Sequence, residues 1–182
     1  MDTSLKYMFD TNVFNRVLDG VISLQTLTGR VVAYATHIQR DEINNTTNPD
    51  RRAALAQVFR EVVTESLPTD SFVLDASRLD EARLGGERVV PTESAVYGVS
   101  RYGQAKYGAE DNLYTALKGR LDKINRNKPN NVQDALIAET SIKGGHVLVT
   151  DDTDLAAVTK QYGGQCISVV ELLAYCSEHG AT

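Results

Sequence analysis

The sequence predicts an α/β fold in which a doubly wound, five-stranded parallel sheet is flanked by helices. Short apolar and β-branched runs alternate with stretches of helical spacing, and helix caps and turn residues separate them. The length of 182 residues fits one domain. We therefore expect residues 1–182 to form a single domain, with a mainly helical insert at about residues 86–130. In such sheets the functional site lies at the carboxyl ends of the strands.

The part of the chain before the insert contains three expected strands. An apolar run at residues 5–9 ends at Asp10, which can cap the helix that follows. Thr36 can cap a second helix, and Pro68 stops a third. Strands are expected at residues 5–9, 30–34 and 72–74, and helices from Asp10 to Gly20, after Thr36, at residues 51–66 and at residues 77–84.

The alternation resumes after the insert. Gly144 and Gly145 follow a stretch of helical spacing and end it before a short apolar run. Helices are expected at residues 109–124, 132–143, 153–162 and 170–177, and strands at residues 147–150 and 166–169.

The composition favours a cytoplasmic protein that does not span a membrane. Hydrophobic residues make up 42% of the chain, but no run approaches the roughly 20 apolar residues of a membrane span. The N-terminus lacks the basic and apolar segments of a secretion signal. Cys166 and Cys176 are expected to be buried thiols rather than a disulfide.

Charge is unevenly distributed along the chain. Residues 86–130 contain eight Lys and Arg against five Asp and Glu, a formal charge of +3, which leaves −8 for the rest of a chain whose net charge is −5. An acidic remainder with a basic insert suits a protein that binds a divalent cation in one place and a polyanion in another.

Four acids are expected to meet at one edge of the sheet. Asp10 follows the first strand and Asp152 follows the fourth. Glu42 lies in the helix after the second strand, and Asp134 lies in the first turn of the helix before the fourth. Like charges at close range are costly unless a cation pairs them, so the pattern indicates a hard divalent ion such as Mg²⁺ or Mn²⁺.

These acids and their neighbours resemble the PIN-domain family. The matching motifs are MFDTNVF at residues 8–14, DEI at residues 41–43, QDALIA at residues 133–138 and LVTDDTDL at residues 148–155. The resemblance implies a metal-dependent endoribonuclease that hydrolyses RNA phosphodiesters. Family members are often the toxin of a toxin–antitoxin pair, so an antitoxin protein is a candidate partner besides the RNA substrate, and a second copy of the chain is another.

The resemblance assigns a role to each acid. The four catalytic acids of the family fall on Asp10, Glu42, Asp134 and Asp152, and a further acid falls on Asp154. As metal ligands it implies Asp10, Asp134, Asp152 and Asp154. The sequence departs from the usual motifs at Gln133, where Asn is common, and at Leu155, where Phe is common; neither residue is a metal ligand in this interpretation.

Structural roles remain open for each acid. Asp10 could be only a helix cap, and Asp134 could only compensate a helix dipole. Asp151 or Asp154 could replace Asp152 as the ligand.

The helical acid and the polar residues beside the acids have similar alternatives. Glu42 has an acidic neighbour, Asp41, and a helical Glu is usually solvated. Three polar residues could orient a ligand or a water, or could serve only as turn residues: Thr11, Asn12 and Thr150.

The insert supplies candidate RNA contacts. Tyr, Gly and a cation recur at residues 97–108, where Tyr can stack on bases and cations can meet phosphates. The candidate RNA-binding residues are Arg101, Lys106, Lys118, Arg120 and Lys123. The alternative is a surface loop followed by a helix with a solvated basic face.

Other functions have weaker support. A non-catalytic RNA-binding or scaffolding protein of the same fold is the main alternative. A receiver-like phosphoacceptor would need a Lys after the fifth strand, where none is found. The sequence also lacks a phosphate-binding glycine loop, the Gly-x-Ser-x-Gly motif of serine hydrolases and the His and Cys spacing of zinc sites.

Overall fold

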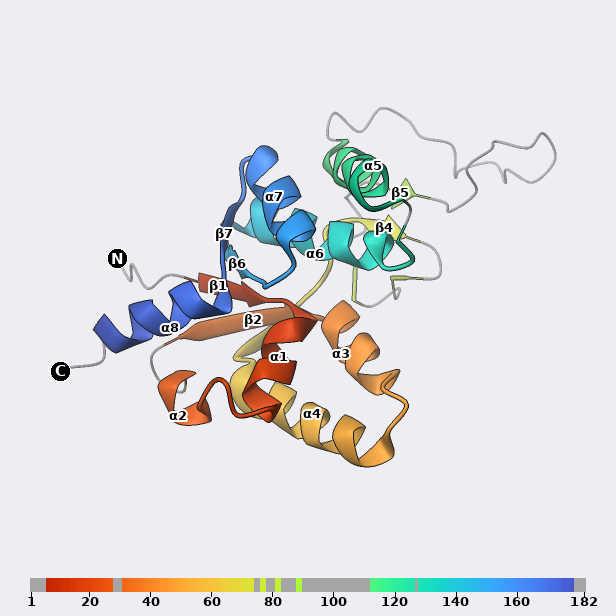
Figure 1. The fold of residues 1–182 in the computed structure, drawn as a ribbon. Coiled ribbons are helices and arrows are strands. Elements are labelled where there is room, and N and C mark those ends of the chain that lie inside the picture. Colours follow the sequence, from red (N-terminus) through yellow and green to blue (C-terminus); the bar gives the residue numbers. More distant parts are fainter. Residues whose placement is uncertain are drawn as a thin grey trace.

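The central feature of the fold is a five-stranded, all-parallel sheet with the strand order β3-β2-β1-β6-β7 (Figure 1). The structure is a computed structural model that describes residues 6–27, 31–73, 76–77, 81–82, 88–89, 112–126 and 128–178. The strands of the sheet are β1 (Lys6–Phe9), β2 (Val32–Thr36), β3 (Glu65–Leu67), β6 (Val147–Val149) and β7 (Gln165–Ile167). The predicted α/β class with a parallel sheet is confirmed.

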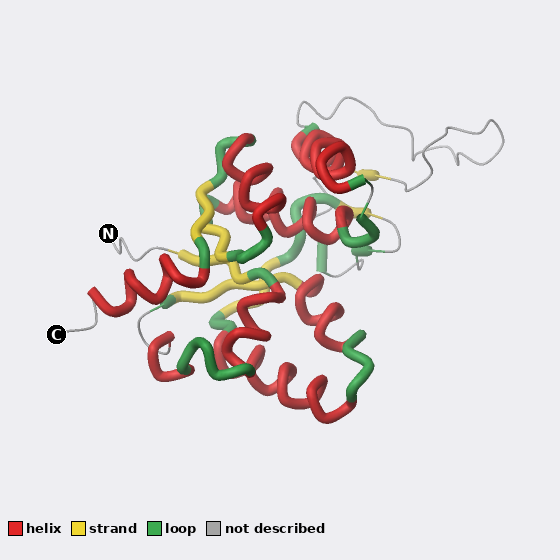
Figure 2. The backbone as a smooth tube through the Cα atoms, in the orientation of Figure 1, coloured by secondary structure: helices red, strands yellow, loops and turns green. Residues whose placement is uncertain are grey.

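Helices cover both faces of this sheet (Figure 2). The described part of the chain contains α1 (Thr11–Leu18), α2 (Leu24–Leu27), α3 (His37–Asn44), α4 (Pro49–Val62), α5 (Leu113–Asn125), α6 (Asn131–Gly144), α7 (Thr153–Gln161) and α8 (Val169–Glu178). Of the expected insert, it includes β5 (Arg88–Val89), which pairs with β4 (Phe72–Val73), and helix α5.

The sheet separates two cores because side chains alternate between its faces. Tyr7 and Phe9 of β1 pack with α1, α2, α4 and α8, whereas Met8 packs with α5, α6 and α7. Leu148 of β6 joins Met8, and its neighbours Val147 and Val149 join the first core. Each of these strands is therefore buried on both sides, as the continuous apolar runs in the sequence require.

The third strand of the sheet lies elsewhere than expected. Helix α4 ends at Val62, and Glu65–Leu67 forms edge strand β3, whereas the expected strand at residues 72–74 contributes Phe72–Val73 to the separate two-stranded sheet. Glu65 and Ser66 are exposed, so this edge strand lacks the apolar run that marks a buried strand. The sequence pattern of such a short, exposed strand is hard to distinguish from that of the last turn of a helix.

A second expectation was wrong in the same region. Residues 77–84 were expected to be helical, but Ala82 forms an isolated parallel bridge with Thr69. Glu81 receives two hydrogen bonds from the Arg40 guanidinium, both of 2.7 Å. These contacts with Thr69 and Arg40 place residues 81–82 in a bridge to another segment instead of a helix.

Within the described residues, no helix combines the length and the apolar character that crossing a bilayer requires.

Candidate metal centre

The acids meet because strands β1 and β6 are neighbours in the sheet. Phe9 pairs with Val149, so the residues that follow them leave the sheet side by side. The backbone N–H of Asp10 still donates to the carbonyl of Val149, at 3.1 Å. Asp10 and Thr150 thus stand at the same carboxyl edge, where an α/β sheet places its site.

Asp10 is a helix cap and a member of the site at once. Its Oδ1 accepts a hydrogen bond from the N–H of Thr11 at 2.6 Å, and its Oδ2 accepts from Thr150 Oγ1 and Asn12 Nδ2, each at 2.6 Å. The residue is only 7% exposed. Burial raises the pKa of this carboxyl, although the hydrogen bonds from Thr150 and Thr11 work in the opposite direction.

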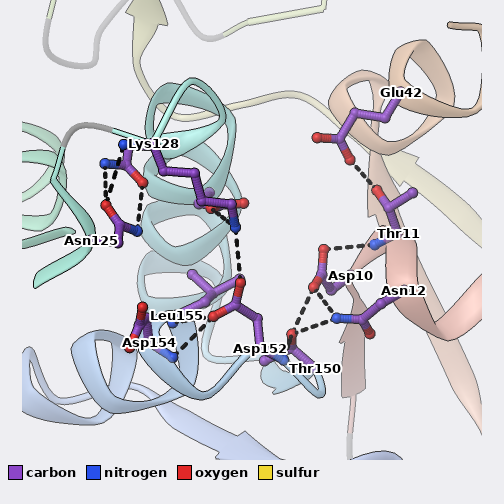
Figure 3. A network of polar contacts seen from close by, with 12 residues as sticks. Asp10, Thr11, Asn12, Glu42, Asn125, Lys128, Thr150, Asp152, Asp154 and Leu155 are labelled. Atoms are coloured by element: carbon purple, nitrogen blue, oxygen red, sulfur yellow. Dashed lines mark hydrogen bonds and ion pairs between the residues drawn. The ribbon is translucent and has the colours of Figure 1, made fainter. Parts of the chain in front are cut away.

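Asp152 is tied to the same edge through Thr150. The hydroxyl of Thr150 accepts from the N–H of Asp152 at 3.0 Å and from Asn12 Nδ2 at 2.9 Å. The Asp152 side chain caps α7, because its Oδ1 accepts from the N–H groups of Asp154 and Leu155 at 2.9 and 3.0 Å. Its other oxygen, Oδ2, is not used by these cap donors. It accepts a hydrogen bond from the Lys128 ammonium and faces the candidate site (Figure 3).

The acids next to Asp152 have different surroundings. Asp151 pairs with Arg16 at 3.0 Å and accepts from the N–H of Val169 at 3.2 Å, so it joins α1 to the start of α8. The Asp154 carboxylate has no hydrogen bond or ion pair with a described residue. Of the three acids at residues 151–154, Asp152 is the one that the structure connects to Asp10.

Glu42 reaches the site from α3. Its Oε2 accepts a hydrogen bond from the Thr11 hydroxyl, at the start of α1. Burial raises the pKa of Glu42, and the charge of Asp10 raises it too. The neighbouring Asp41 instead lies 4.0 Å from Arg40. The helical acid that faces Asp10 is therefore Glu42.

Asp134 is a buried acid whose pKa is strongly raised. It lies in the first turn of α6 and is 8% exposed. The pKa of its carboxyl is raised to about 7, first by burial and then by the negative charge of Asp10. The charges of Asp152 and Glu42 raise this pKa as well, whereas the Lys128 ammonium lowers it. Four carboxylates from four segments thus share one electrostatic environment.

Sequence reasoning missed Lys128 as a member of the site. Its Nζ lies 3.1 Å from an Asp152 oxygen and 3.6 Å from an Asp134 oxygen, so these two oxygens are no farther apart than the two distances added together. From the sequence alone, Lys128 was only one of the eight cations of the basic insert. A possible signal was its place in a polar turn, with Pro129 and Asn130, directly before the helix that carries Asp134.

The donor set suits Mg²⁺ or Mn²⁺ better than a softer ion. The acids offer oxygen ligands only, and Thr11 and Thr150 add hydroxyl groups. The raised pKa values of Asp10 and Asp134 indicate that the site disfavours the ionised form of these carboxyls, which a bound cation would stabilise. Among the described residues, however, no three Asp, Glu, His or Cys side chains are already arranged to hold a metal ion.

The basic helix α5 lies beside the two helices that carry Asp134 and Asp152, because it packs against α6 and α7. Among the described residues, its cations have partners other than these acids, or none. Lys118 pairs with Asp122 at 2.7 Å, and Arg120 donates to Gln161, at the far end of α7 from Asp152, at 3.1 Å. Lys123 is exposed. The other candidate RNA contacts, Arg101 and Lys106, lie outside the described residues.

Comparison with known proteins bears on the fold. No protein-family model and no curated protein matches the sequence. A solved structure, PAE2754 from Pyrobaculum aerophilum, superposes with a TM-score of 0.52 and 16% sequence identity. The match covers 97% of this chain and 100% of that chain. At this level of identity the likeness shows a shared fold and leaves the activity to be argued from the site.

Proposed function

We propose that this chain is a metal-dependent endoribonuclease of the PIN type, which hydrolyses RNA phosphodiesters with Mg²⁺ or Mn²⁺. The observation that carries the proposal is the convergence of Asp10, Glu42, Asp134 and Asp152, with the pKa of Asp134 raised to about 7 by burial and by its acidic neighbours. Buried like charges with perturbed pKa values are typical of sites that bind a cation.

Each residue has a defined part in the proposed reaction. Asp10, Asp134 and Asp152 would hold the ion, with Glu42 as a direct or water-mediated ligand. Thr150 and Asn12 orient the Asp10 carboxylate through their hydrogen bonds. A bound divalent ion would supply Lewis-acid stabilisation of the scissile phosphate and activate a water for attack. No side chain is needed as a covalent nucleophile.

Asp154 has the weakest support as a ligand. Its carboxylate makes no contact with the other acids, and its N–H is used in the cap of α7. We place it at the rim of the proposed site, where it could bind a water or a second ion.

One observation favours a non-catalytic alternative. The Lys128 ammonium already compensates Asp134 and Asp152, as it would in an RNA-binding protein that keeps the fold without the reaction. The recruitment of RNA by Arg101, Lys106 and helix α5 is common to both functions, as is a role for an antitoxin protein or a second copy of the chain as partner.

The experiment that tests the proposal compares two adjacent acids. Purified protein is incubated with a labelled RNA in Mn²⁺ or in EDTA, as wild type, Asp152→Asn and Asp151→Asn. Asn keeps an oxygen that can cap α7, so the fold of the first variant should survive. We expect wild type to cleave only with Mn²⁺, and Asp152→Asn to be slower by on the order of 100-fold or more.

Asp151→Asn is the matched control, because Asp151 contacts Arg16 and the N–H of Val169 rather than the other acids. It should cleave like wild type. Equal cleavage in EDTA, or equal rates for Asp152→Asn and wild type, would contradict the proposal.

A further inference from the structure

The Lys128 ammonium lies among the acids of the candidate site. Within the described part of the chain, it is the only Lys or Arg that forms an ion pair with any of Asp10, Glu42, Asp134 and Asp152. Its ammonium contacts Asp134, in the first turn of α6, and Asp152, at the start of α7. The contact with Asp152 is drawn in Figure 3. In the absence of another cation, this ammonium compensates part of their charge.

The turn that carries Lys128 is held in place by a network of hydrogen bonds. The N–H of Lys128 lies 3.4 Å from Asn125 Oδ1, and its carbonyl accepts from the N–H of Asn131 at 3.0 Å. The side chains of Asn125 and Asn131 exchange two hydrogen bonds of 2.8 and 2.9 Å, and Asn131 is only 2% exposed. Asn131 also donates to Asp122, at 2.7 Å. The backbone of Lys128 is therefore fixed beside the acids, while its long side chain can still swing.

A divalent ion bound to these acids would lie close to this ammonium. An ion on the same Asp152 oxygen would lie about 2.1 Å from it. Lys128 Nζ lies 3.1 Å from that oxygen, so the two cations would be within the sum of these distances of each other. Two cations at such a separation repel strongly, and the ion carries the larger charge. The Lys128 side chain is 41% exposed, so it has an open path to solvent.

We propose that Lys128 and the divalent ion compete for Asp134 and Asp152, and that metal binding releases the ammonium to contact a phosphate of the RNA. This inference rests on the proposed ribonuclease function. The released ammonium stays beside the acids because its backbone is held by Asn125 and Asn131. A lysine suits both partners, since it is a flexible point charge rather than a rigid fork. Lys118 and Arg120 are less suited, because Asp122 and Gln161 engage them.

The test uses Lys128→Met and a matched control, Lys160→Met. Met keeps most of the length of the side chain and removes the charge. Lys160 is exposed near the end of α7 and has no ion pair with a described residue, so the control makes the same change of net charge away from the acids. Calorimetric titration with Mn²⁺, without RNA, measures metal affinity. Initial rates with an RNA oligonucleotide at saturating Mn²⁺ measure KM and kcat separately.

Lys128→Met should bind Mn²⁺ roughly three- to tenfold more tightly than wild type, since the exposed ion pairs that it removes are worth little individually. Its KM for RNA should rise by a similar factor, while Lys160→Met matches wild type in both measurements. A residue with only a structural role would not tighten metal binding. Unchanged or weaker Mn²⁺ affinity in Lys128→Met, or an unchanged KM, would overturn the inference.

The titration also separates this inference from the proposed function. If wild type binds and uses Mn²⁺ but Lys128→Met binds it no better, the competition alone is wrong. If neither protein binds Mn²⁺, both the competition and the metal-dependent ribonuclease are wrong.

Discussion

Asp134 and Asp152 have oppositely shifted pKa values although both contact Lys128. Asp152 accepts hydrogen bonds from two backbone N–H groups at the start of α7, and these bonds, with that of Lys128, outweigh burial and lower its pKa. Asp134 has the weaker Lys128 contact, of 3.6 Å, and its pKa is raised to about 7 by burial and by its acidic neighbours. Neighbouring groups thus shift the pKa values of chemically identical side chains in opposite directions.

This difference predicts how metal-free stability depends on pH. Because the folded state raises the pKa of Asp134, the folded protein binds this proton more tightly than the unfolded chain does. The associated stability is fully present below about pH 4 and is lost as the pH rises to about 7. In EDTA, wild type should melt at least about 3 °C lower at pH 8 than at pH 5.5, and Asp134→Asn should show a smaller change.

The raised pKa values of Asp10 and Glu42 act in the same direction, so Asp134→Asn should flatten the slope without removing it. Saturating Mn²⁺ should remove most of the decrease at pH 8, because the ion compensates the charges that form there. A variant with the full slope of wild type would contradict the assignment to Asp134.

Helices α5 and α6 are joined next to the site by a hydrogen-bond network and a shared hydrophobic core. The polar turn between them joins Asp122, Asn125 and Asn131 in one hydrogen-bond network, and Leu117 and Leu121 of α5 pack in the same core as the apolar residues of α6. The same turn holds the backbone of Lys128. The position of the site cation is therefore decided by the packing of two helices against each other rather than by either helix alone.

The network predicts unequal effects of two similar substitutions. Asn131→Ala removes a buried side chain that makes three hydrogen bonds, so it should lower the free energy of unfolding by about 1–3 kcal/mol. Asn125→Ala should cost less, about 1 kcal/mol, because Asn125 is partly exposed and water can replace its bonds. Urea unfolding in EDTA measures the free energy of unfolding of both variants. Equal losses would indicate that water, rather than the buried Asn131 side chain, satisfies the hydrogen bonds of the turn.

The distribution of charge matters over the whole molecule. The chain carries −5 in total, while residues 86–130 carry +3. Of the described cations of the insert, Lys118 is engaged by Asp122, Arg120 by Gln161 and Lys128 by the acids, whereas Lys123 is exposed. An acidic protein that binds RNA would then depend on further cations of the insert for recruitment.

This argument predicts a role for Arg101 and Lys106. Changing both to Ala should weaken RNA binding and reduce the slope of log affinity against log salt by roughly one unit for each phosphate that is no longer neutralised. Arg60→Ala with Lys160→Ala, two exposed cations outside the insert, is the control and should leave the slope unchanged. If the insert instead binds an antitoxin or a second copy of the chain, the first pair should change complex formation in size-exclusion chromatography and leave RNA affinity unaltered.

Much of the fold was predictable from local patterns. The alternation of apolar runs with helical spacing predicted the parallel sheet, and Thr36 caps α3 as expected, through its hydroxyl and Gln39. The edge strand Glu65–Leu67 was not predictable in this way, because it is exposed and carries no apolar run. Residues 81–82 were misassigned since their conformation depends on contacts with Thr69 and Arg40.

The sequence by itself determined the class of fold and indicated the four acids, because the alternation of elements along the chain, the helix caps and the ends of strands follow from short-range chemistry. Only the tertiary structure decided that Asp152 rather than Asp151 faces Asp10, and that Lys128 pairs with two of the acids. Both facts depend on the direction of side chains and on partners far away in the chain. Such contacts leave no periodic trace in the sequence, since they arise when separate elements pack together.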